Sequence, residues 1–463
     1  MHRLLLALLA ALPLYCATSP ATAWTPARWP WTDTASLSLL DNSPINCLLV
    51  EAAPADIARL AAAAATRHVA VLAVLHPGAD PLPAARAATQ AKASGIVLEG
   101  DFAPGVAARV SDSLSSTPVI ELTLRSRMQL TGSAAVIGTF QGVWPGIQVT
   151  DEGKAKAAPS GAAWIDTNSG FLRAARAWGH MVWIANRPPD KTVITTERYL
   201  QAIGDAEIVG AHWVLSLDAD TAQRLSRRDA AALKTWQRMN ATLRFFDAHA
   251  AWRDLLPAGK LAVVQGADDG ALLSGGVIDM IAVKHTPVRA VPPGRVDSAK
   301  LQGVTMAVDL DPASLTPGER EVLKDFTRAG GTVLTGPPGW KDPATPQKER
   351  ITLDEKELKR LDDIWRDVQN MIGRKNLGVR LFNVSSMLSN LLSSPDGKQV
   401  VVQLINYADY PVENVTVHVL GKFHHARLLT PEGVDKDVEV YENEEGTGVD
   451  LDVVGTCAAI QLD

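Results

Sequence analysis

The stretch that decides the fold spans residues 46–99 and reads NCLLVEAAPADIARLAAAAATRHVAVLAVLHPGADPLPAARAATQAKASGIVLE. Three short apolar runs, at 46–51, 69–75 and 95–99, have the length and composition of buried strands. Alanine-rich amphipathic stretches such as 54–67 separate them and predict helices. Strands that alternate with helices predict right-handed βαβ units and a parallel sheet.

The same alternation continues for most of the first half of the chain. Strand-like runs follow at 119–125, 135–141, 181–186 and 213–218. Seven strands in this rhythm predict an α/β fold with a (β/α)8 TIM-barrel-like N-terminal domain. The eighth strand is not evident, and its candidates are residues 36–40, 162–166 and 261–265. A doubly wound open sheet is the alternative architecture.

A second, smaller α/β unit is predicted downstream of the barrel. Strand-like runs lie at 261–265, 288–291, 304–309 and 332–335, which indicates a small flavodoxin-like domain. Before the last of these runs, the sequence Thr316-Pro317-Gly318-Glu319 has the form of a capping box with proline at the first helical position. The pair Gly330-Gly331 is typical of a helix end.

The C-terminal part of the chain changes character. An amphipathic helix is predicted over residues 354–372. From residue 379, short β runs alternate with turns such as Pro395-Asp396-Gly397, which predicts an antiparallel β-sandwich. The predicted boundaries are 1–23 for a signal peptide, 24–255 for the barrel, 256–345 for the middle domain, 346–378 for a helical linker and 379–463 for the sandwich.

The N-terminus is predicted to be a cleavable secretory signal peptide. Arg3 precedes an apolar run over residues 4–14, and Ala21-Thr22-Ala23 supplies small residues for cleavage after Ala23. We therefore expect a secreted or periplasmic protein. The alternative is a lipoprotein anchored through Cys16, which the bulky Tyr15 disfavours. No later segment has the roughly 20 apolar residues that a membrane span needs.

Composition excludes several classes of protein. A hydrophobic fraction of 46% with 21% charged residues is typical of a globular chain. The net charge of -6 gives no basic footprint for nucleic acid, so no nucleic-acid partner is expected. Of three cysteines, Cys47 and Cys457 are interpreted as buried thiols. Adjacent strand residues such as His424 and His425 point to opposite faces, so neither a metal nor a cofactor is predicted.

Polar residues at the strand ends predict the site. In a barrel, alternate strand residues face the lumen and the helices. Within 119–125, Glu121 is expected to face the lumen with Thr123 and Arg125, because the apolar residues between them should face the helices. Most polar strand residues fall near the carboxyl ends, where (β/α)8 enzymes place their sites.

Converging carboxylates predict glycoside hydrolysis, which needs one acid and one nucleophile or base. Our catalytic candidates are Glu99, Glu121 and Asp218, with Glu99 and Asp101 expected to repel as neighbouring anions. The predicted substrate-binding residues are Glu51, Asp101, Arg125, Gln141, Trp144, Trp164, Asp166, Asn168 and Asn186.

Each of these residues also has a structural interpretation. Glu121 and Arg125 could form a buried ion pair, and Asp218 could cap a helix. The same capping interpretation applies to Glu51 and Glu99. Trp144 and Trp164, predicted here as platforms for sugar rings, could instead anchor the loop over residues 142–164.

The order of domains resembles the three-domain β-galactosidases and related barrel glycoside hydrolases. The stretch LTPGEREVLKDFTRAGGTVLTG at 315–336 resembles their middle domain, which is similar to class I glutamine amidotransferases. QLINY, HVLG and RLLTP within 400–431 resemble their C-terminal sandwich. Between Cys47 and Cys457 the chain has no cysteine, so the middle domain lacks the nucleophile that amidotransferases need. The family's Asn-Glu pair at the end of the fourth strand is also missing, since that run ends Thr-Leu-Arg at 123–125.

The predicted function is that of an exported glycoside hydrolase acting on oligo- or polysaccharide. The alternative is a non-catalytic carbohydrate-binding or structural protein on the same scaffold. A serine hydrolase is disfavoured, because the sequence has no G-x-S-x-G elbow. The resemblance also implies that the middle domain serves assembly, so a homo-oligomer is expected.

Overall fold

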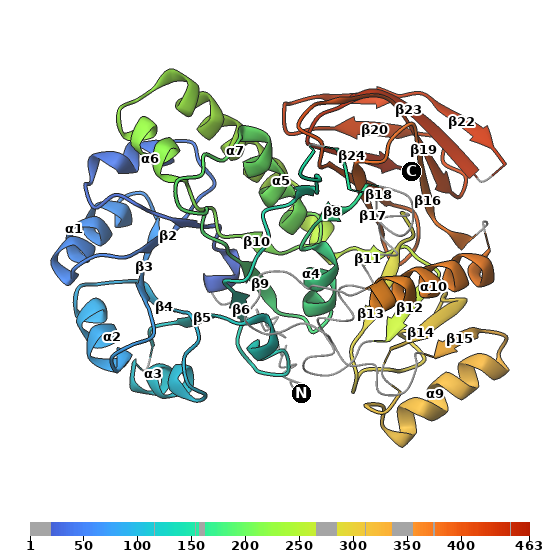
Figure 1. Cartoon of the computed structure of the whole chain (residues 1–463), viewed down its shortest axis with the longest axis horizontal. Coiled ribbons are helices and arrows are strands. Elements are labelled where there is room, and N and C mark those ends of the chain that lie inside the picture. Colours follow the sequence, from blue (N-terminus) through green and yellow to red (C-terminus); the bar gives the residue numbers. More distant parts are fainter. Residues whose placement is uncertain are drawn as a thin grey trace, which may run out of the picture.

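A computed structural model of the chain provides the coordinates. The residues that the structure describes are 20–114, 116–152, 154–156, 163–264, 285–310, 312–335, 355–373, 376–444 and 446–463. The predicted signal peptide falls mostly outside them. Figure 1 shows the N-terminal half as a ring of strands surrounded by helices, with the C-terminal sheets stacked beside it.

The N-terminal half is a parallel, nearly closed barrel. Its strands, in spatial order, are β1 (Pro26–Arg28), β2 (Cys47–Val50), β3 (Ala70–Leu75), β4 (Gly95–Glu99), β5 (Val119–Thr123), β6 (Val136–Thr139), β9 (Met181–Ile184) and β10 (His212–Trp213). Every neighbouring pair is parallel. A parallel bridge from Ala27 to Leu215 joins the two edges, and the Arg28 amide donates to the Leu215 carbonyl at 2.8 Å. The predicted barrel is therefore confirmed, and the open doubly wound sheet is wrong.

The eighth strand is β1, which the sequence did not reveal. All three candidates for it were wrong. Residues 36–40 lie in a 3-10 helix, η2 (Ala35–Leu40), and 165–166 form β8 (Ile165–Asp166), paired antiparallel with β7 (Gly146–Ile147). Residues 261–264 belong to another sheet. A strand of three residues that starts at a proline is too short to show a period, although proline is tolerated at a strand's first residue.

Helices cover the outside of the barrel. The apolar residues between helices and strands are separate from the apolar core that fills the lumen. These helices are α1 (Pro54–Ala65), α2 (Pro81–Gln90), α3 (Val106–Leu114), α4 (Ser169–Arg176), α5 (Thr196–Glu207), α6 (Ala219–Ser226) and α7 (Ala230–Ala248). Leu48, Ile96 and Leu98 pack outward with residues of α1 to α3. Cys47 and Val97, from the alternate positions, pack inward with one another. The lumen is therefore filled with apolar side chains.

The predicted orientation of β5 is wrong. Ile120 and Leu122 belong to the lumen core, while Val119 packs against the outer core. Glu121 shares the outer face with Val119, because strand side chains alternate. The prediction assumed that the apolar face of β5 meets the helices. In this barrel the lumen at that height is also apolar, so polarity alone does not identify the inner face.

A second parallel sheet follows the barrel. Its order is β13 (Val288–Val291), β12 (Leu261–Val264), β14 (Met306–Asp309) and β15 (Thr332–Thr335). The predicted capping box is confirmed at α9 (Pro317–Arg328), where the Glu319 amide donates to Thr316 Oγ1 at 3.2 Å. Val368 of α10 (Glu355–Ile372) packs into the same core as β12 and β14. Assignment of this unit to the flavodoxin-like class stays a prediction.

Two antiparallel sheets form the predicted C-terminal sandwich. The first has the order β11 (Leu256–Pro257), β17 (Met387–Ser393), β18 (Val400–Asn406), β24 (Cys457–Leu462), β20 (Ala426–Leu429) and β21 (Asp435–Val438). The second has the order β16 (Val379–Phe382), β19 (Val412–Leu420), β23 (Gly446–Val454) and β22 (Val440–Asn443). Residues of both sheets share one apolar core, among them Val402 and Val417.

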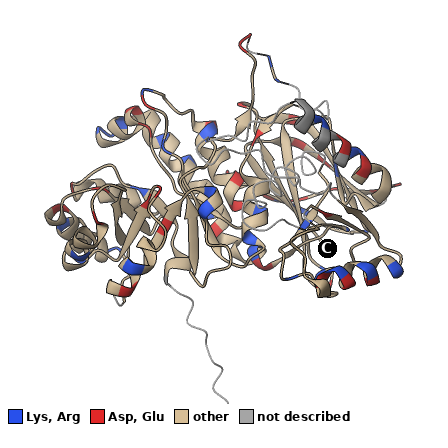
Figure 2. Ribbon diagram, turned by 60° about the horizontal axis from the view of Figure 1, so that its bottom comes forward, with Lys and Arg blue, Asp and Glu red and all other residues tan. Residues whose placement is uncertain are grey.

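The sandwich docks against α5 of the barrel. Gln201 Nε2 donates to the Ala408 carbonyl at 3.1 Å, and the Tyr407 hydroxyl donates to Asp205 at 2.6 Å. Both Cys47 and Cys457 are buried free thiols, as predicted. Basic and acidic residues are interspersed over the ribbon (Figure 2). Among the described residues, no helix is both long and apolar enough to cross a bilayer.

Candidate active site at the barrel mouth

Five charged or titratable side chains meet at the carboxyl ends of the barrel strands. Arg28 ends β1, Glu51 and His76 follow β2 and β3, Glu99 ends β4, and Arg187 follows β9. The carboxyl ends of parallel strands lie on one rim of a barrel, so residues distant in sequence converge there. We refer to Arg28, Glu51, His76, Glu99 and Arg187 as the mouth cluster.

Glu99 is the buried anchor of the mouth cluster. It is only 6% exposed. Arg28 holds it in a bidentate pair, with Nη1 and Nη2 at 2.6 and 2.5 Å from its two oxygens. Arg187 Nη2 adds a contact at 3.3 Å. A planar guanidinium matches a carboxylate in this way, so Glu99 is held as an anion in a fixed orientation.

Glu51 is the accessible carboxylate of the cluster. Its side chain is 41% exposed and contacts Arg187 by an ion pair and His76 Nε2 at 3.3 Å. Partial burial on its own would raise the pKa of Glu51, but the hydrogen bonds and charges of Arg187 and His76 lower it below the ordinary value. Glu51 is therefore ionised at neutral pH and faces solvent.

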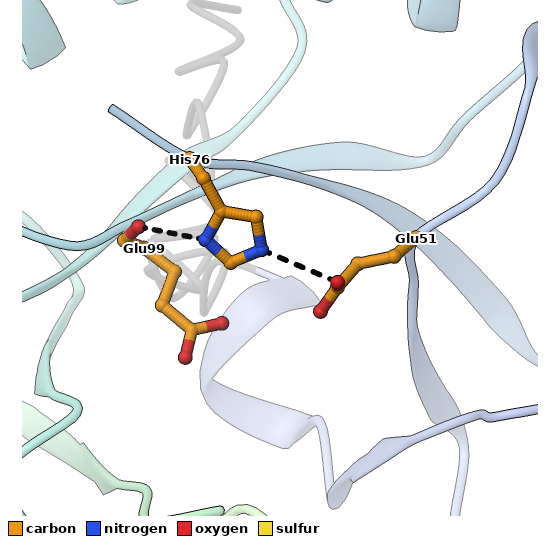
Figure 3. Close-up of side chains that lie close together, drawn as sticks. All are labelled: Glu51, His76 and Glu99. Atoms are coloured by element: carbon orange, nitrogen blue, oxygen red, sulfur yellow. Dashed lines mark hydrogen bonds and ion pairs between the residues drawn. The ribbon is translucent and has the colours of Figure 1, made fainter. Parts of the chain in front are cut away.

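His76 lies between the two glutamates of the mouth cluster (Figure 3). Its Nδ1 is 3.1 Å from the Glu99 carbonyl oxygen, which can only accept, so Nδ1 is the donor in this contact. Its Nε2 is 3.3 Å from a Glu51 carboxylate oxygen and 3.5 Å from Arg187 Nη2. His76 therefore connects the backbone of Glu99 to the exposed carboxylate of Glu51.

The same three residues have the donor set of a small cation site. One oxygen from each of Glu51 and Glu99 and a ring nitrogen of His76 lie within 4.8 Å of one another. Carboxylate and imidazole ligands suit several divalent metals. However, both carboxylates already pair with arginines, and a metal ion would add positive charge beside Arg28 and Arg187. The arrangement therefore favours an ion-pair cluster over a metal centre.

A cavity of about 540 Å³ opens beside the mouth cluster. Arg28, Glu51 and Arg187 form one wall, and the loops after β1, β9 and β10 form the rest, with Trp29 and Lys191 among their residues. This volume lies within the range of about 300–1,000 Å³ that is usual for small-molecule sites. The exposed carboxylate of Glu51 forms part of the wall of this cavity.

Two of the three catalytic candidates lie outside this cluster. Asp218 lines the cavity but is 2% exposed and caps α6, accepting from the Thr221 amide at 2.9 Å and from the Tyr199 hydroxyl at 2.7 Å. Burial alone would raise the pKa of Asp218, but these hydrogen bonds lower it. Glu121 lies on the outer face of β5, where burial raises its pKa. The structure does not bring Glu121 together with Glu99.

The predicted repulsion between Glu99 and Asp101 is also wrong. Asp101 is half-exposed and pairs with Arg127. The charged groups in contact with the Glu99 carboxylate are Arg28 and Arg187, so its surroundings are positive.

The remaining polar candidates mostly support loops. Arg125 Nη2 donates to Asn168 Oδ1 at 2.9 Å, and Asn168 also accepts from the Val143 amide at 2.8 Å. Gln141 Oε1 accepts from the Arg125 amide at 2.8 Å. Two further hydrogen bonds, from Gln148 to Asp166 at 2.6 Å and from Asn186 to the Gly142 carbonyl at 2.7 Å, hold the segment after β6. No Glu121–Arg125 ion pair forms between these two described residues.

The two tryptophans also have structural contacts. Trp144 packs edge-on against Trp213 and Tyr199, with ring centroids 5.1 and 5.7 Å away. The Lys156 ammonium lies over the Trp164 ring, 5.5 Å from its centroid. Both contacts agree with the loop-anchoring interpretation.

Sequence reasoning gave no role to Arg28, His76 or Arg187. Arg28 could be found only by recognising β1, which is three residues long. His76 directly follows the apolar run at 69–75, and the sequence placed it at a strand end with Glu51 and Asn186, but without a function. Arg187 follows the run at 181–186, and the pair Pro188-Pro189 after it marks the start of a loop.

Comparison with known proteins places the fold. No protein-family model and no curated relative matches the sequence. Among solved structures, α-L-fucosidase isoenzyme 2 from Paenibacillus thiaminolyticus matches with a TM-score of 0.62 at 10% identity, over 93% of this chain and 96% of that one. A rhamnosidase from Novosphingobium sp. PP1Y matches with a TM-score of 0.45 at 13% identity, over 77% and 38%. A family 30 subfamily 8 xylanase from Clostridium acetobutylicum matches with a TM-score of 0.32 at 10% identity, over 95% of each chain.

The fucosidase match extends over nearly the whole of both chains. The chain therefore shares the fold of that protein, with a barrel followed by antiparallel sheets. At such low identity the likeness concerns the fold alone.

Proposed function

We propose that this protein is an exported glycoside hydrolase that acts on oligo- or polysaccharide at the barrel mouth. The observation that carries the proposal is the mouth cluster itself. It places an accessible ionised carboxylate, Glu51, in contact with the imidazole of His76, and Glu51 lines a cavity large enough for a sugar.

Each member of the cluster has a role in this proposal. Glu51 attacks the sugar or activates a water molecule, and His76 donates the proton to the leaving oxygen. Substrate in the cavity takes the place of the direct contact between Glu51 and His76. Glu99 is a positioning residue, since its bidentate pair fixes Arg28 and its third contact orients Arg187 against Glu51. Of the three catalytic candidates from the sequence, only Glu99 enters the proposal.

The experiment is a screen of aryl glycosides, followed by Glu51→Gln and His76→Gln in the most active assay. Both substitutions should reduce kcat by at least about 100-fold, the lower end for losing a positioned acid or base. Glu321→Gln is the matched control, because Glu321 is an exposed carboxylate of α9 that pairs with Lys324 and does not line the mouth cavity. If the Glu51 and His76 variants keep the activity of the control, the assignment is wrong.

The alternative is a non-catalytic carbohydrate-binding protein, and one observation favours it. Glu99 and Asp218 are buried and fully engaged as acceptors, so neither offers a free acid next to Glu51. Binding of oligosaccharides by calorimetry without hydrolysis of any glycoside would support this alternative. It would exclude the hydrolase proposal.

The domain boundaries belong to the same proposal. We propose a signal peptide over 1–23, the barrel over 24–255, a flavodoxin-like, amidotransferase-like middle domain over 256–345, a helical linker over 346–378 and the sandwich over 379–463. The strand order of the middle sheet, 2-1-3-4 along the chain, supports its class. The relation to three-domain β-galactosidases and self-association through the middle domain remain parts of the proposal.

A further inference from the structure

A second cavity, of about 430 Å³, lies on the opposite side of the barrel from the mouth cluster. Its walls come from the C-terminal ends of α4 and α5, the segment after α7, strand β13 and the sandwich strands β17 and β18. Helices of a (β/α)8 barrel run back toward the amino-terminal ends of the strands. The cavity therefore lies at the junction of three parts of the molecule and is remote from the proposed hydrolytic site.

The charges around this cavity are unbalanced. Among the described residues, its lining contains the basic residues Arg173, Arg176, Arg253, Arg289 and Lys300 and one carboxylate, Glu207. That carboxylate is already occupied on both oxygens. Oε1 accepts from His212 Nδ1 at 2.6 Å, and Oε2 accepts from Arg253 Nη2 at 2.9 Å.

Two of the arginines have no carboxylate partner among the described residues. Arg289 Nη1 donates to the carbonyls of Lys300 and Gln302, each at 2.9 Å, and Arg176 Nη1 donates to the His180 carbonyl. The Nε–H of each guanidinium is buried without a hydrogen-bond acceptor. Burying a cation without an anion is costly unless a counter-charge binds.

The pKa directions agree with this geometry. Burial lowers the pKa of Arg289. Burial and the charge of Arg253 lower the pKa of Arg176, and they outweigh the opposing charges of Asp254 and Glu207. An anion between these guanidinium groups would reverse both effects and would accept the free Nε–H bonds.

We propose that this cavity binds a phosphate or sulfate group carried on a sugar-sized compound. Guanidinium groups match tetrahedral oxyanions through paired, charge-assisted hydrogen bonds. The volume exceeds that of a bare ion, and Trp252, Val288 and Leu392 supply an apolar wall for the body of the ligand. Because the lining comes from the barrel, the parallel sheet and the sandwich, the bound anion ties these three parts together.

The test uses the full chain with inorganic phosphate and inorganic sulfate as probes. Thermal unfolding is followed in millimolar phosphate, sulfate or acetate against sodium chloride at equal ionic strength, and phosphate binding is measured by isothermal titration. A ligand that binds only the native state raises Tm in a saturable way. We expect a saturable rise with phosphate or sulfate and a smaller one with acetate, and the ion with the larger effect identifies the preferred group.

Variants locate the effect. Arg289→Gln and Arg176→Gln should each weaken phosphate binding by at least tenfold, while Arg328→Gln, an exposed arginine of α9, should leave it unchanged. If one cavity variant does not fold, the other still decides the matter. Equal binding in the cavity variants and the control, or no saturable rise above chloride, would overturn the proposal. Activity at the barrel mouth is not part of this readout, so the two proposals fail independently.

Discussion

A single methyl group should reveal how tightly the barrel and the sandwich dock. Gly204 lies within α5, where the helix packs against the sandwich. A Cβ at this position would lie 2.5 Å from Cys457 Sγ and 3.0 Å from Ile405 Cδ1. Both neighbours are buried, at 1% and 0% exposure, and belong to the paired strands β24 and β18. Neither side chain can move into solvent to make room.

The expected magnitude follows from two opposing effects of Gly204→Ala. Replacing glycine by alanine inside a helix stabilises it by about 1 kcal/mol. Overpacking a buried contact typically costs about 1–3 kcal/mol, and a 2.5 Å approach to a fixed sulfur belongs at the upper end. The net result should be a loss of about 2 kcal/mol in the free energy of unfolding.

The double variant with Cys457→Ala tests the cause. Removing Sγ alone deletes one buried heavy atom, which costs about 1 kcal/mol. In the double variant the new methyl occupies the vacated space, so its stability should return close to that of the unmodified protein. The coupling between the two sites should be about 3 kcal/mol, at the top of the usual range for contacting residues.

The assay is urea unfolding followed by tryptophan fluorescence for the single variants, the double variant and a control. Gly318→Ala is the matched control, because Gly318 also lies in a helix but has nothing within 4 Å of its Cβ position. It should be as stable as the unmodified protein or more so. If Gly204→Ala behaves like this control, or if Cys457→Ala does not rescue it, α5 and the sandwich are not packed as described.

Three further expectations concern the Asp218 cap of α6, the buried Glu207 carboxylate and the N-terminus of the chain. Asp218→Ala should lower the free energy of unfolding by about 1–2 kcal/mol through loss of the α6 cap, and Asp218→Asn by less; calorimetry showing equal losses would contradict the capping role. Burial on its own would raise the pKa of Glu207, but the charges and hydrogen bonds of His212 and Arg253 outweigh burial and lower this pKa. Ionised Glu207 therefore stabilises the fold fully above the pKa of an ordinary glutamate, and this stabilisation is lost as the pH falls through the lowered pKa. The urea midpoint of Glu207→Gln should therefore vary less with pH in the acid range. Secreted protein should begin at Trp24 by intact mass, and further deletion through Arg28 should abolish the folded circular dichroism signal because β1 is lost.

The order of strands and helices was predictable because short apolar runs alternate regularly with amphipathic stretches. The runs at 69–75 and 95–99 became β3 and β4, and the capping box at Thr316 marked a helix start correctly. β1 was not predictable, since three residues show no period and its pairing with β2 and Leu215 depends on closure of the barrel. The register of strand pairing and the closure of the barrel depend on the whole sheet, so a local sequence pattern does not predict them.

The site was harder to predict because polarity does not reveal direction or partners. Glu99 was identified, but the sequence could not show that Arg28, 71 residues away, would neutralise it. Glu121 was assigned to the lumen because its apolar neighbours were expected to face outward, whereas they fill the lumen core. Asp218 looked equally like a cap and a catalytic residue, and only its acceptor bonds show that it serves as a cap.

The charge balance at the two ends of the barrel suggests different ligands. At the mouth, the positive charges of Arg28 and Arg187 balance the negative charges of Glu51 and Glu99. A cluster with balanced charges does not attract an anionic substrate, so we expect its ligand to be an uncharged sugar. At the far cavity, Arg176 and Arg289 have no carboxylate partner among the described residues, and both oxygens of Glu207 are already paired, so an anionic ligand suits this cavity. The two cavities share no lining residue, so we expect phosphate and a neutral glycoside to bind without competing with each other.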